Sequence, residues 1–311
     1  MGYALGEPVF PQVMKGPSKI IVSIDLDMWY HCRWATGSEG ALWKDTSALY
    51  ADYYQSDRPG TEIETYTDDV LALLQKYGIR ATFFVLGEVA ELFPRLIRRI
   101  NREGHEIGCH GWYHVDSDKL GEEEFRAQVG RAKQLLEDLT GRTIEGFRVP
   151  NLVIPSRFPE IIRDLGFSYD SSICPSRRFF GKYSGLMDYP VNPFLFKIEG
   201  LQPLVEIPIP VFPLFRLPAC SGIVTRVFGG IWTMTALRSA LKGGDAMYYF
   251  HPYEIGQKPD LPKQTWYIRI FFRNIGDPFI SMLDRILAFA RERGTITAGE
   301  AARSMLKQYQ S

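Results

Sequence analysis

Short apolar runs alternate with amphipathic segments along the first half of the chain, and this rhythm limits the folds open to it. Runs rich in β-branched and aromatic residues predict strands at Lys19–Leu26, Arg80–Leu86, Glu106–His110, Gly146–Val149 and from Ser168 onward. Between them, apolar residues at helical spacing predict helices at Thr67–Tyr77, Pro94–Glu103, Gly121–Thr140 and Pro159–Leu165. This order predicts an α/β fold with parallel strands inside and helices outside.

The rhythm breaks in the second half of the chain. Prolines interrupt residues 181–220 and exclude a long helix or a central strand from most of that segment, so Val205–Phe212 is expected to be an edge strand. The pattern then predicts a helix at Thr233–Lys242, a strand at Ala246–His251 and a helix at Pro278–Arg293. Because the sequence has no internal repeat and no low-complexity linker, we expect residues 1–311 to form a single domain.

Charge and composition exclude several classes of function. Lys+Arg and Asp+Glu number 36 each, whereas a nucleic-acid-binding protein normally shows a basic excess. No window approaches the roughly 18 consecutive apolar residues of a membrane span, and the first residues do not resemble a secretory signal. The four cysteines are scattered, which indicates free thiols in a reducing compartment. We therefore expect a cytoplasmic protein with no membrane span and no nucleic-acid partner.

A histidine pair follows the third predicted strand. In the stretch GHEIGCHGWYHVDSD, His110 and His114 are four residues apart where a strand passes into a loop. Neutral imidazole nitrogen is a favoured ligand for zinc and related metals, so the pair is a candidate metal site. Taken alone, the spacing is equally compatible with two histidines on the protein surface.

Polar residues also stand at the ends of the other predicted strands. Asp25 and Asp27 end the first strand, Arg148 the fourth, Asp170 the fifth and His251 the last. Each has an ordinary explanation by itself: a loop cap, a surface salt bridge, a turn residue or a core histidine. Because the carboxyl ends of parallel strands meet at one edge, however, these side chains are expected to converge on one pocket with His110 and His114.

Six stretches in order resemble the polysaccharide deacetylases, which are the family-four carbohydrate esterases. They are Ser23–Asp27 (SIDLD), Tyr77–Gly87 (YGIRATFFVLG), Gly104–His114 (GHEIGCHGWYH), Gly146–Pro150 (GFRVP), Tyr169–Ile173 (YDSSI) and Tyr248–Pro252 (YYFHP). The resemblance implies a distorted (β/α)7 barrel over residues 19–299. It also implies one divalent metal ion, most often zinc, with cobalt, nickel, manganese or iron as alternatives.

The resemblance also implies a role for each strand-end residue. Asp27, His110 and His114 would be the metal ligands. Asp25 would be the general base with Arg148 as its partner. His251 would be the general acid, with Asp170 as the group that orients it. Asn151, which follows Pro150, stands where the family offers a backbone N–H to the oxyanion.

The first motif departs from most of the family, whose two acids are adjacent. Here they are spaced as Asp-x-Asp, which resembles a subgroup that includes intracellular deacetylases and related amide hydrolases. Residues i and i+2 of a strand face the same side, so both carboxylates can enter one pocket. The excursions at residues 28–60 and 181–220 are further departures, and we expect them at the barrel mouth, where loops select the substrate.

The implied activity is metal-dependent removal of an N-acetyl or related acyl group from an amide-bearing sugar, such as a polysaccharide or its precursor. Two alternatives are an amidohydrolase of the same fold that acts on a non-sugar amide, cyclic ureide or formamide, and a non-catalytic sugar-binding barrel. Assembly as a homo-oligomer is compatible with the sequence. The aromatic residues Trp29, Tyr30, Trp112 and Tyr113 are candidates for stacking on a sugar ring, although core packing explains them equally well.

Two further histidines are placed by their position on predicted elements. His31, four residues after Asp27, is a candidate additional ligand. His105 begins its strand rather than ending it, so we expect it outside the pocket.

Overall fold

The computed structural model describes residues 8–9, 17–155, 157–177, 186–261 and 265–310, so part of the predicted excursion at residues 181–220 lies outside the described residues. Within these ranges, nine strands form one sheet in the order β1-β7-β8-β6-β5-β4-β3-β2-β11. Their bounds are β1 (Pro8–Val9), β2 (Ile20–Leu26), β3 (Thr82–Val85), β4 (Glu106–Cys109), β5 (Gly146–Phe147), β6 (Tyr169–Asp170), β7 (Phe194–Phe196), β8 (Leu204–Glu206) and β11 (Ala246–Phe250). Strands β9 (Val211–Phe212) and β10 (Leu217–Pro218) form a separate hairpin.

Seven strands of the sheet, counted over the described ranges, run parallel from β8 through β6, β5, β4, β3 and β2 to β11. β7 is antiparallel to β8, and β1 is antiparallel to β7. Within the described part of the chain no strand pair joins β8 to β11, so the ring of parallel strands stays open between them. This is the distorted (β/α)7 barrel that the family resemblance implies.

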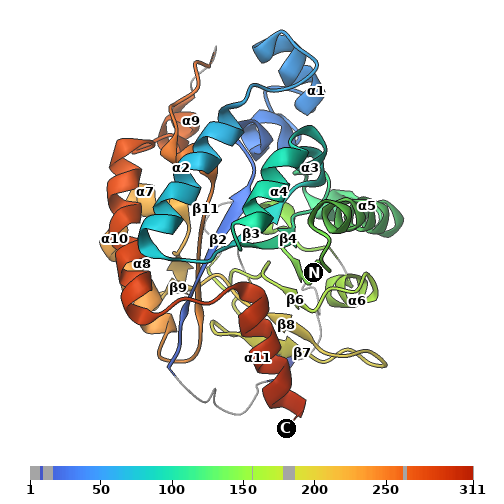
Figure 1. The fold of residues 1–311 in the computed structure, drawn as a ribbon, viewed down its shortest axis with the longest axis vertical. Helices are drawn as coiled ribbons and strands as arrows, with labels where there is room; N and C mark the ends of the chain where they lie inside the picture. The colour runs from blue at the N-terminus through green and yellow to red at the C-terminus, as the bar shows by residue number, and fades with distance from the viewer. Residues whose placement is uncertain (1–7, 10–16, 156, 178–185, 262–264, 311) are drawn as a thin grey trace.

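Helices surround the sheet (Figure 1). They are α1 (Thr46–Leu49), α2 (Glu62–Tyr77), α3 (Gly87–Leu92), α4 (Pro94–Arg102), α5 (Glu122–Thr140), α6 (Phe158–Asp164), α7 (Gly222–Phe228), α8 (Gly230–Ala240), α9 (Trp266–Phe271), α10 (Asp277–Arg293) and α11 (Ala298–Gln310). None of the described helices is both long and apolar enough to cross a membrane.

Helix boundaries follow capping chemistry. Gly78 and Gly141 end α2 and α5 in the left-handed conformation (φ of 63° and 65°), as predicted for glycine after a helix. The predicted start of α2 at Thr67 is wrong, because Glu62 and Glu64 already occupy its first turn and Thr67 is buried inside the helix.

The predicted edge strand is also wrong. Residues Leu204–Glu206 form β8, which pairs with β6 on one side and β7 on the other and is buried along its length. Pro208 and Pro210 follow the strand directly, so they do not remove any of its ladder hydrogen bonds. The proline-rich segment therefore supplies a parallel strand of the barrel as well as loops.

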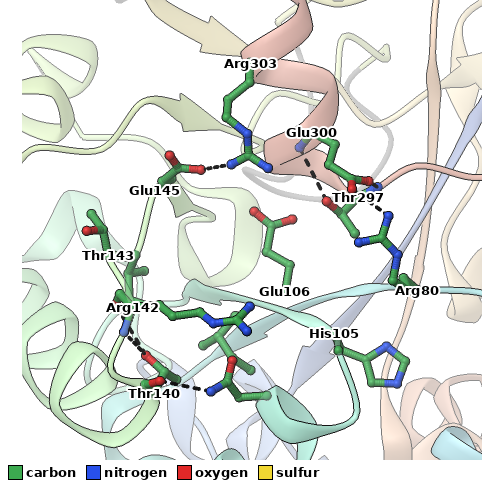
Figure 2. Close-up of a pocket in the computed structure, with 14 residues that line it drawn as sticks. Arg80, His105, Glu106, Thr140, Arg142, Thr143, Glu145, Thr297, Glu300 and Arg303 are labelled. Atoms are coloured by element: carbon green, nitrogen blue, oxygen red, sulfur yellow. Dashed lines mark hydrogen bonds and ion pairs between the residues drawn. The ribbon is translucent and has the colours of Figure 1, made fainter.

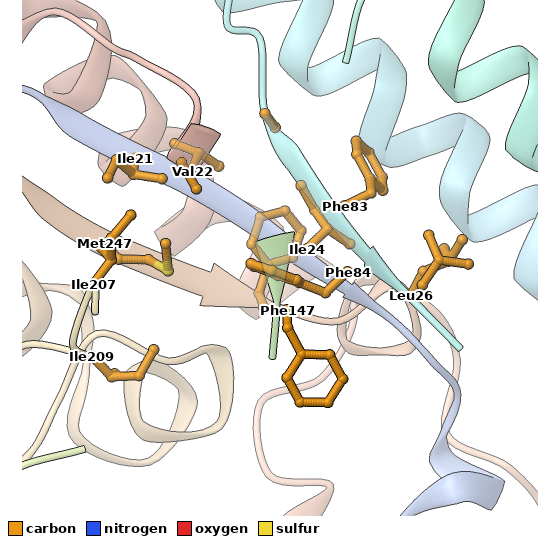
Figure 3. Packing of buried hydrophobic residues seen from close by; sticks show 14 of the residues in the cluster. Ile21, Val22, Ile24, Leu26, Phe83, Phe84, Phe147, Ile207, Ile209 and Met247 are labelled. Carbon is orange, nitrogen blue, oxygen red and sulfur yellow. The ribbon is translucent and has the colours of Figure 1, made fainter. Parts of the chain in front are cut away.

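The core lies on both faces of the sheet. β2 is buried at all seven positions, as expected of a strand covered by helices on one face and by the barrel interior on the other. Figure 3 shows the apolar side chains of β2, β3, β5 and β11 packed against one another. Ser23 and Asp25 alternate with Val22 and Ile24 along β2, so polar groups enter the barrel interior only near the carboxyl end of the strand.

Candidate functional site

The predicted metal ligands lie together at the carboxyl end of the sheet. Asp27 and His110 follow the ends of β2 and β4, and His114 lies in the loop after β4. One ligand atom from each of the three residues lies within 4.8 Å of the others. His114 Nε2 is 3.2 Å and His110 Nε2 is 4.0 Å from Asp27 Oδ2.

The hydrogen bonding of this cluster leaves three polar atoms free to bind a metal. Asp27 Oδ1, His110 Nε2 and His114 Nδ1 are buried and have no hydrogen-bond partner, although buried polar atoms are normally paired. His110 Nδ1 lies 2.8 Å from the carbonyl oxygen of Arg148, so the proton of a neutral imidazole is placed there and the Nε2 lone pair is left free. These unpaired atoms fit a cation held by one carboxylate and two imidazoles.

Burial controls the charge of the three ligands. Burial raises the pKa of Asp27 to about 7, and it lowers the pKa of His110 to about 4 and that of His114 well below its usual value. Both imidazoles are therefore neutral near pH 7, which is the form that binds a metal.

Asp25 and Arg148 form a buried ion pair beside this cluster. Arg148 Nη1 donates to Asp25 Oδ1 at 2.6 Å and to Ser23 Oγ at 3.1 Å, and its Nε donates to the carbonyl of Ser171 at 2.9 Å. The guanidinium is fully buried and stacks over the ring of Phe84 at 4.3 Å. Asp25 is thereby held in one position, with its second oxygen outside the contact to Arg148 Nη1.

The carboxylate that contacts His251 is Glu254, and the prediction that Asp170 orients this histidine is wrong. Glu254 Oε2 lies 3.1 Å from His251 Nδ1 and accepts from His251 N–H at 2.9 Å. The cause is local: Pro252 begins a 3-10 turn over Pro252–Ile255, which brings the residue three positions after His251 back to it. The sequence signal was the order His-Pro-x-Glu.

The same neighbours control the proton on His251. Burial alone would lower the pKa of His251, but the carboxylates of Asp27, Glu254 and Asp25 outweigh burial and raise this pKa to about 9. The His251 side chain keeps 14% of its surface exposed, whereas Glu254 is fully buried. His251 therefore carries a proton near neutral pH and has one partly accessible edge.

Asp170 lies inside the barrel with a different set of partners. It accepts from Ser172 Oγ at 2.7 Å and from Ser172 N–H at 3.0 Å. Its neighbour on β8 is Glu206, whose pKa is raised well above the usual range by burial and by the charge of Asp170. Asp170 and Glu206 thus form a buried carboxyl pair, and within the described part of the chain the partners of Asp170 do not include His251.

The other two histidines are placed apart from the ligand cluster. His31 Nδ1 accepts from Met28 N–H at 2.9 Å, and its Nε2 lies 3.6 Å from Glu88 Oε2. Its ring is 6.5 Å from that of His114, which makes it a neighbour of the metal ligands rather than one of them. His105 directly precedes β4, and its Nδ1 accepts from Ala81 N–H, as expected for a residue outside the pocket.

His105 lines a separate polar cavity of about 160 Å³ at the amino ends of β3 and β4. Figure 2 shows His105, Glu106 and Arg80 there, together with Arg303 from α11. Glu106 accepts from Thr82 Oγ1 at 2.7 Å and from Gly299 N–H at 3.0 Å, so it joins β4 to the start of α11. The charged groups of this cavity therefore hold α11 against the amino-terminal end of the barrel.

The loop after β5 contains a strained residue at the predicted oxyanion position. Asn151 has a φ of 58°, which is uncommon for a residue with a side chain. Its Nδ2 donates to Asp116 Oδ1 at 3.1 Å, and Asp116 Oδ2 accepts from Arg33 Nη2 at 2.7 Å. The first excursion thus reaches across the mouth to hold this loop.

The candidate sugar-stacking residues divide between core and surface. Trp29, Tyr30 and Trp112 are at most 4% exposed, and Arg131 covers the ring of Trp112 at 3.4 Å. Tyr113 is 44% exposed between the two histidine ligands in sequence. Tyr113 therefore remains the one candidate of these four that is open to a sugar ring.

Two family models match consecutive parts of the chain. Residues 48–169 match polysaccharide deacetylase, and residues 171–286 match a domain of unknown function, DUF3473. The strands of both parts belong to one sheet.

Curated relatives match a short part of the chain. It is 38% identical over 91 residues to the peptidoglycan-N-acetylglucosamine deacetylase of Bacillus cereus, which covers 29% of this chain and 33% of that protein. It is 30% identical over 104 residues to the peptidoglycan deacetylase of Helicobacter pylori, covering 33% of this chain and 36% of that protein. The chain therefore spans about a third of the length of these two relatives.

Solved structures match nearly the whole chain. A Mycobacterium smegmatis structure assigned to the polysaccharide deacetylases has a TM-score of 0.66 at 19% identity and covers 98% of this chain and 96% of that one. A Bacillus anthracis protein described as a CE4 family pseudoenzyme has a TM-score of 0.52 at 13% identity and covers 96% and 69%. At these identities the likeness establishes the fold and confirms the predicted barrel type.

Proposed function

We propose that this chain, of which residues 48–169 match the polysaccharide deacetylase family, is a metal-dependent hydrolase of that family that removes an N-acetyl group from an amide-bearing sugar. The observation that carries the proposal is the arrangement around Asp27, His110 and His114. The Asp25 carboxylate, held by Arg148, and the His251 imidazole, held by Glu254, both lie close enough to Asp27 to shift its pKa. A site that only bound sugar would need neither group.

The three ligands would hold one divalent cation. Two imidazoles and one carboxylate suit zinc, with cobalt, nickel, manganese or iron as the alternatives. When bound, such a cation lowers the pKa of a water molecule and polarises the amide carbonyl. Asp27 contributes the negative charge, and the hydrogen bond from His110 to the Arg148 carbonyl orients the first imidazole.

The other residues of the site would move the protons. Asp25, fixed by the 2.6 Å contact to Arg148, would accept a proton from the attacking water. The backbone N–H of Asn151 would donate to the oxyanion. His251, whose Nδ1 is engaged by Glu254, would donate a proton from Nε2 to the leaving amine, which is otherwise a poor leaving group.

The substrate class is proposed from the names of the relatives. The matched Bacillus cereus and Helicobacter pylori proteins are named as peptidoglycan deacetylases, so we propose an N-acetylglucosamine-containing polysaccharide or its precursor. Tyr113 is the exposed aromatic residue beside the ligands that would stack on a sugar ring.

Acetate release from a panel of N-acetylated sugars tests the proposal. The panel contains peptidoglycan fragments, chitooligosaccharides, nucleotide-linked N-acetylhexosamines, a formylated sugar, a cyclic ureide and a simple aryl amide. We expect turnover of at least one N-acetyl sugar, loss of turnover on chelation, and recovery with zinc or cobalt. Full turnover by the chelated protein would reject the proposal.

Substitution of Asp25 separates catalysis from binding. Asp25→Asn should keep one metal per chain and lose turnover, whereas Asp284→Asn, at a half-buried surface ion pair with Lys76, serves as a control. If the wild-type protein binds a sugar but turns over no member of the panel, the sugar-binding alternative is correct. If only the ureide or the aryl amide reacts, the amidohydrolase alternative is correct.

We also propose a cytoplasmic location, supported by the four free cysteines, three of which are buried. Cell fractionation tests this directly. Recovery in the wall or periplasmic fraction would overturn it and would favour mature peptidoglycan over a precursor.

A further inference from the structure

Glu254 is supported by a second buried charge that the proposed reaction does not use. Its Oε2 contacts the Nδ1 and backbone N–H of His251, and its Oε1 accepts from Arg226 Nε at 2.8 Å. Arg226 and Glu254 are both fully buried. A buried ion pair of this kind is weak evidence for net stability, but removal of either partner leaves an uncompensated buried charge.

Arg226 reaches this carboxylate from α7 and also binds the end of α9. Its Nη1 donates to the carbonyl oxygens of Phe271 and Arg273, the latter at 2.9 Å. The backbone carbonyl of Arg226 accepts from Asn274 Nδ2 at 2.7 Å. One guanidinium thus joins the carboxylate behind His251 to the segment that follows α9.

That segment returns to the histidine through a stack of rings. Phe271 lies on Tyr253 with ring centroids 5.8 Å apart and an interplanar angle of 21°, and Tyr253 lies on His251 at 5.1 Å and 23°. The imidazole is therefore held at its edge by Glu254 and on its face by Tyr253. Both contacts connect to Arg226, because Arg226 donates to Glu254 and to the carbonyl oxygen of Phe271, on which Tyr253 stacks.

The charge of Arg226 keeps the carboxylate ionised. Burial would raise the pKa of Glu254, but Arg226 and then His251 outweigh burial and lower it. An ionised Glu254 accepts hydrogen bonds at both oxygens, which fixes the imidazole with Nδ1 toward the carboxylate and Nε2 toward the pocket. The other charged groups that face His251 are Asp27 and Asp25.

We propose that Arg226 is a positioning residue for the general acid, acting through Glu254 and the Tyr253–Phe271 stack to hold His251 in the orientation that protonates the leaving amine. The inference rests on the proposed function of His251. Substitution of Arg226 should leave the metal ligands and Asp25 in place. Within the described residues, its side chain hydrogen-bonds to Glu254 and to the end of α9, on the side of the site that holds His251.

The test compares two reactions of the metal-loaded, full-length protein. An N-acetyl sugar needs a protonated leaving group, whereas 4-nitrophenyl acetate has a leaving group that departs without one. Arg226→Met and Glu254→Gln should lower the ratio of amide to ester turnover on the order of 100-fold, mainly in kcat, with one metal per chain retained. Arg226→Lys should recover part of the loss, because lysine keeps the charge without the planar fork.

The matched control is Arg238→Met, since Arg238 lies on the neighbouring α8, is exposed, and stacks on Phe289 away from His251. It should leave both reactions unchanged. If Arg226→Met keeps the wild-type ratio, or loses both reactions in proportion together with metal, the inference is overturned. If this variant does not fold, Arg226→Lys and Glu254→Gln decide by the same ratio.

A nuclear magnetic resonance measurement keeps this inference separate from the proposed function. In the metal-loaded wild-type protein, the Nδ1–H of His251 should give a slowly exchanging downfield signal, assigned by its loss in His251→Gln. The signal should be lost or shifted in Arg226→Met or Arg226→Lys and kept in Arg238→Met. A signal that is unaffected by either Arg226 substitution overturns the inference, even if the wild-type protein turns over no sugar amide.

Discussion

Metal binding at acidic pH should release one proton, and that proton should come from Asp27. Burial raises the pKa of Asp27 to about 7 in the metal-free protein and lowers the pKa of His110 to about 4. The pKa of His114 is lowered well below its usual value for the same reason. A metal binds only deprotonated ligands. At pH 5.5 the two imidazoles are expected to be neutral, whereas the carboxyl group of Asp27 still carries its proton.

The expected pH dependence follows from that one carboxyl group. Between pH 7 and pH 5 its ionised fraction falls from about one half to about one hundredth, so the apparent affinity for zinc should fall about 50-fold, or about 2.3 kcal/mol. Two histidines with ordinary pKa values near 6.5 would instead lower the affinity about 600-fold and release two protons.

Calorimetric titration with zinc at pH 5.5, in buffers of different ionisation enthalpy, counts the protons. We expect about one in the wild-type protein and none in Asp27→Asn. Because Asp27 contributes to the raised pKa of His251, the titration is repeated in His251→Gln, where one proton should remain. Two protons in both the wild-type protein and Asp27→Asn would refute the reasoning, since the histidines would then be the source.

Three further measurements test the site. The raised pKa of Asp27 means that its ionisation costs stability as pH rises from about 4 to 7, by about 4 kcal/mol in total. Metal-free Asp27→Asn should therefore unfold at higher urea than the metal-free wild type at pH 8, with the order reversed in zinc. Arg148→Met leaves a buried carboxylate without its partner, so it should lose about 3–5 kcal/mol of stability and at least about 100-fold in turnover; unchanged turnover would exclude the Arg-held base. Gly222→Ala places a Cβ in collision with Glu254 Oε2 and should reproduce the turnover loss of Glu254→Gln, whereas Gly230→Ala, with its nearest atom at 3.8 Å, should leave turnover unchanged.

The strand-end residues could be predicted because two simple rules combine. Apolar runs between amphipathic segments predict parallel strands, and the carboxyl ends of parallel strands share one edge. Those rules bring Asp27, His110 and His114 together without any knowledge of loop structure. The Asp25–Arg148 contact was expected from the family resemblance, and the structure shows it between the ends of β2 and β5.

The errors arose where a residue's partner lies on an element that the local pattern does not reveal. β6 is only two residues long, so no periodicity shows that Asp170 faces Glu206 of β8 rather than His251. β8 itself is three residues long and is defined by pairing on both sides. The C-terminal helix α11 was missed for a different reason, because a local signal was present: Thr297 and Glu300 form a capping box at its start, and apolar residues follow at helical spacing.

The proposed site draws on three parts of the chain that the comparisons treat separately. Asp25 and Asp27 precede the matched deacetylase segment, which contains His110, His114 and Arg148. His251, Glu254 and Arg226 all belong to the matched domain of unknown function. Since solved structures with this fold include a protein described as a pseudoenzyme, the fold alone does not decide whether amides are cleaved. Metal and base can activate water, but an amine leaves only when it is protonated. Under the proposed function, the second segment supplies the acid and its support as well as strands of the barrel, so changes around His251 should separate amide cleavage from metal binding.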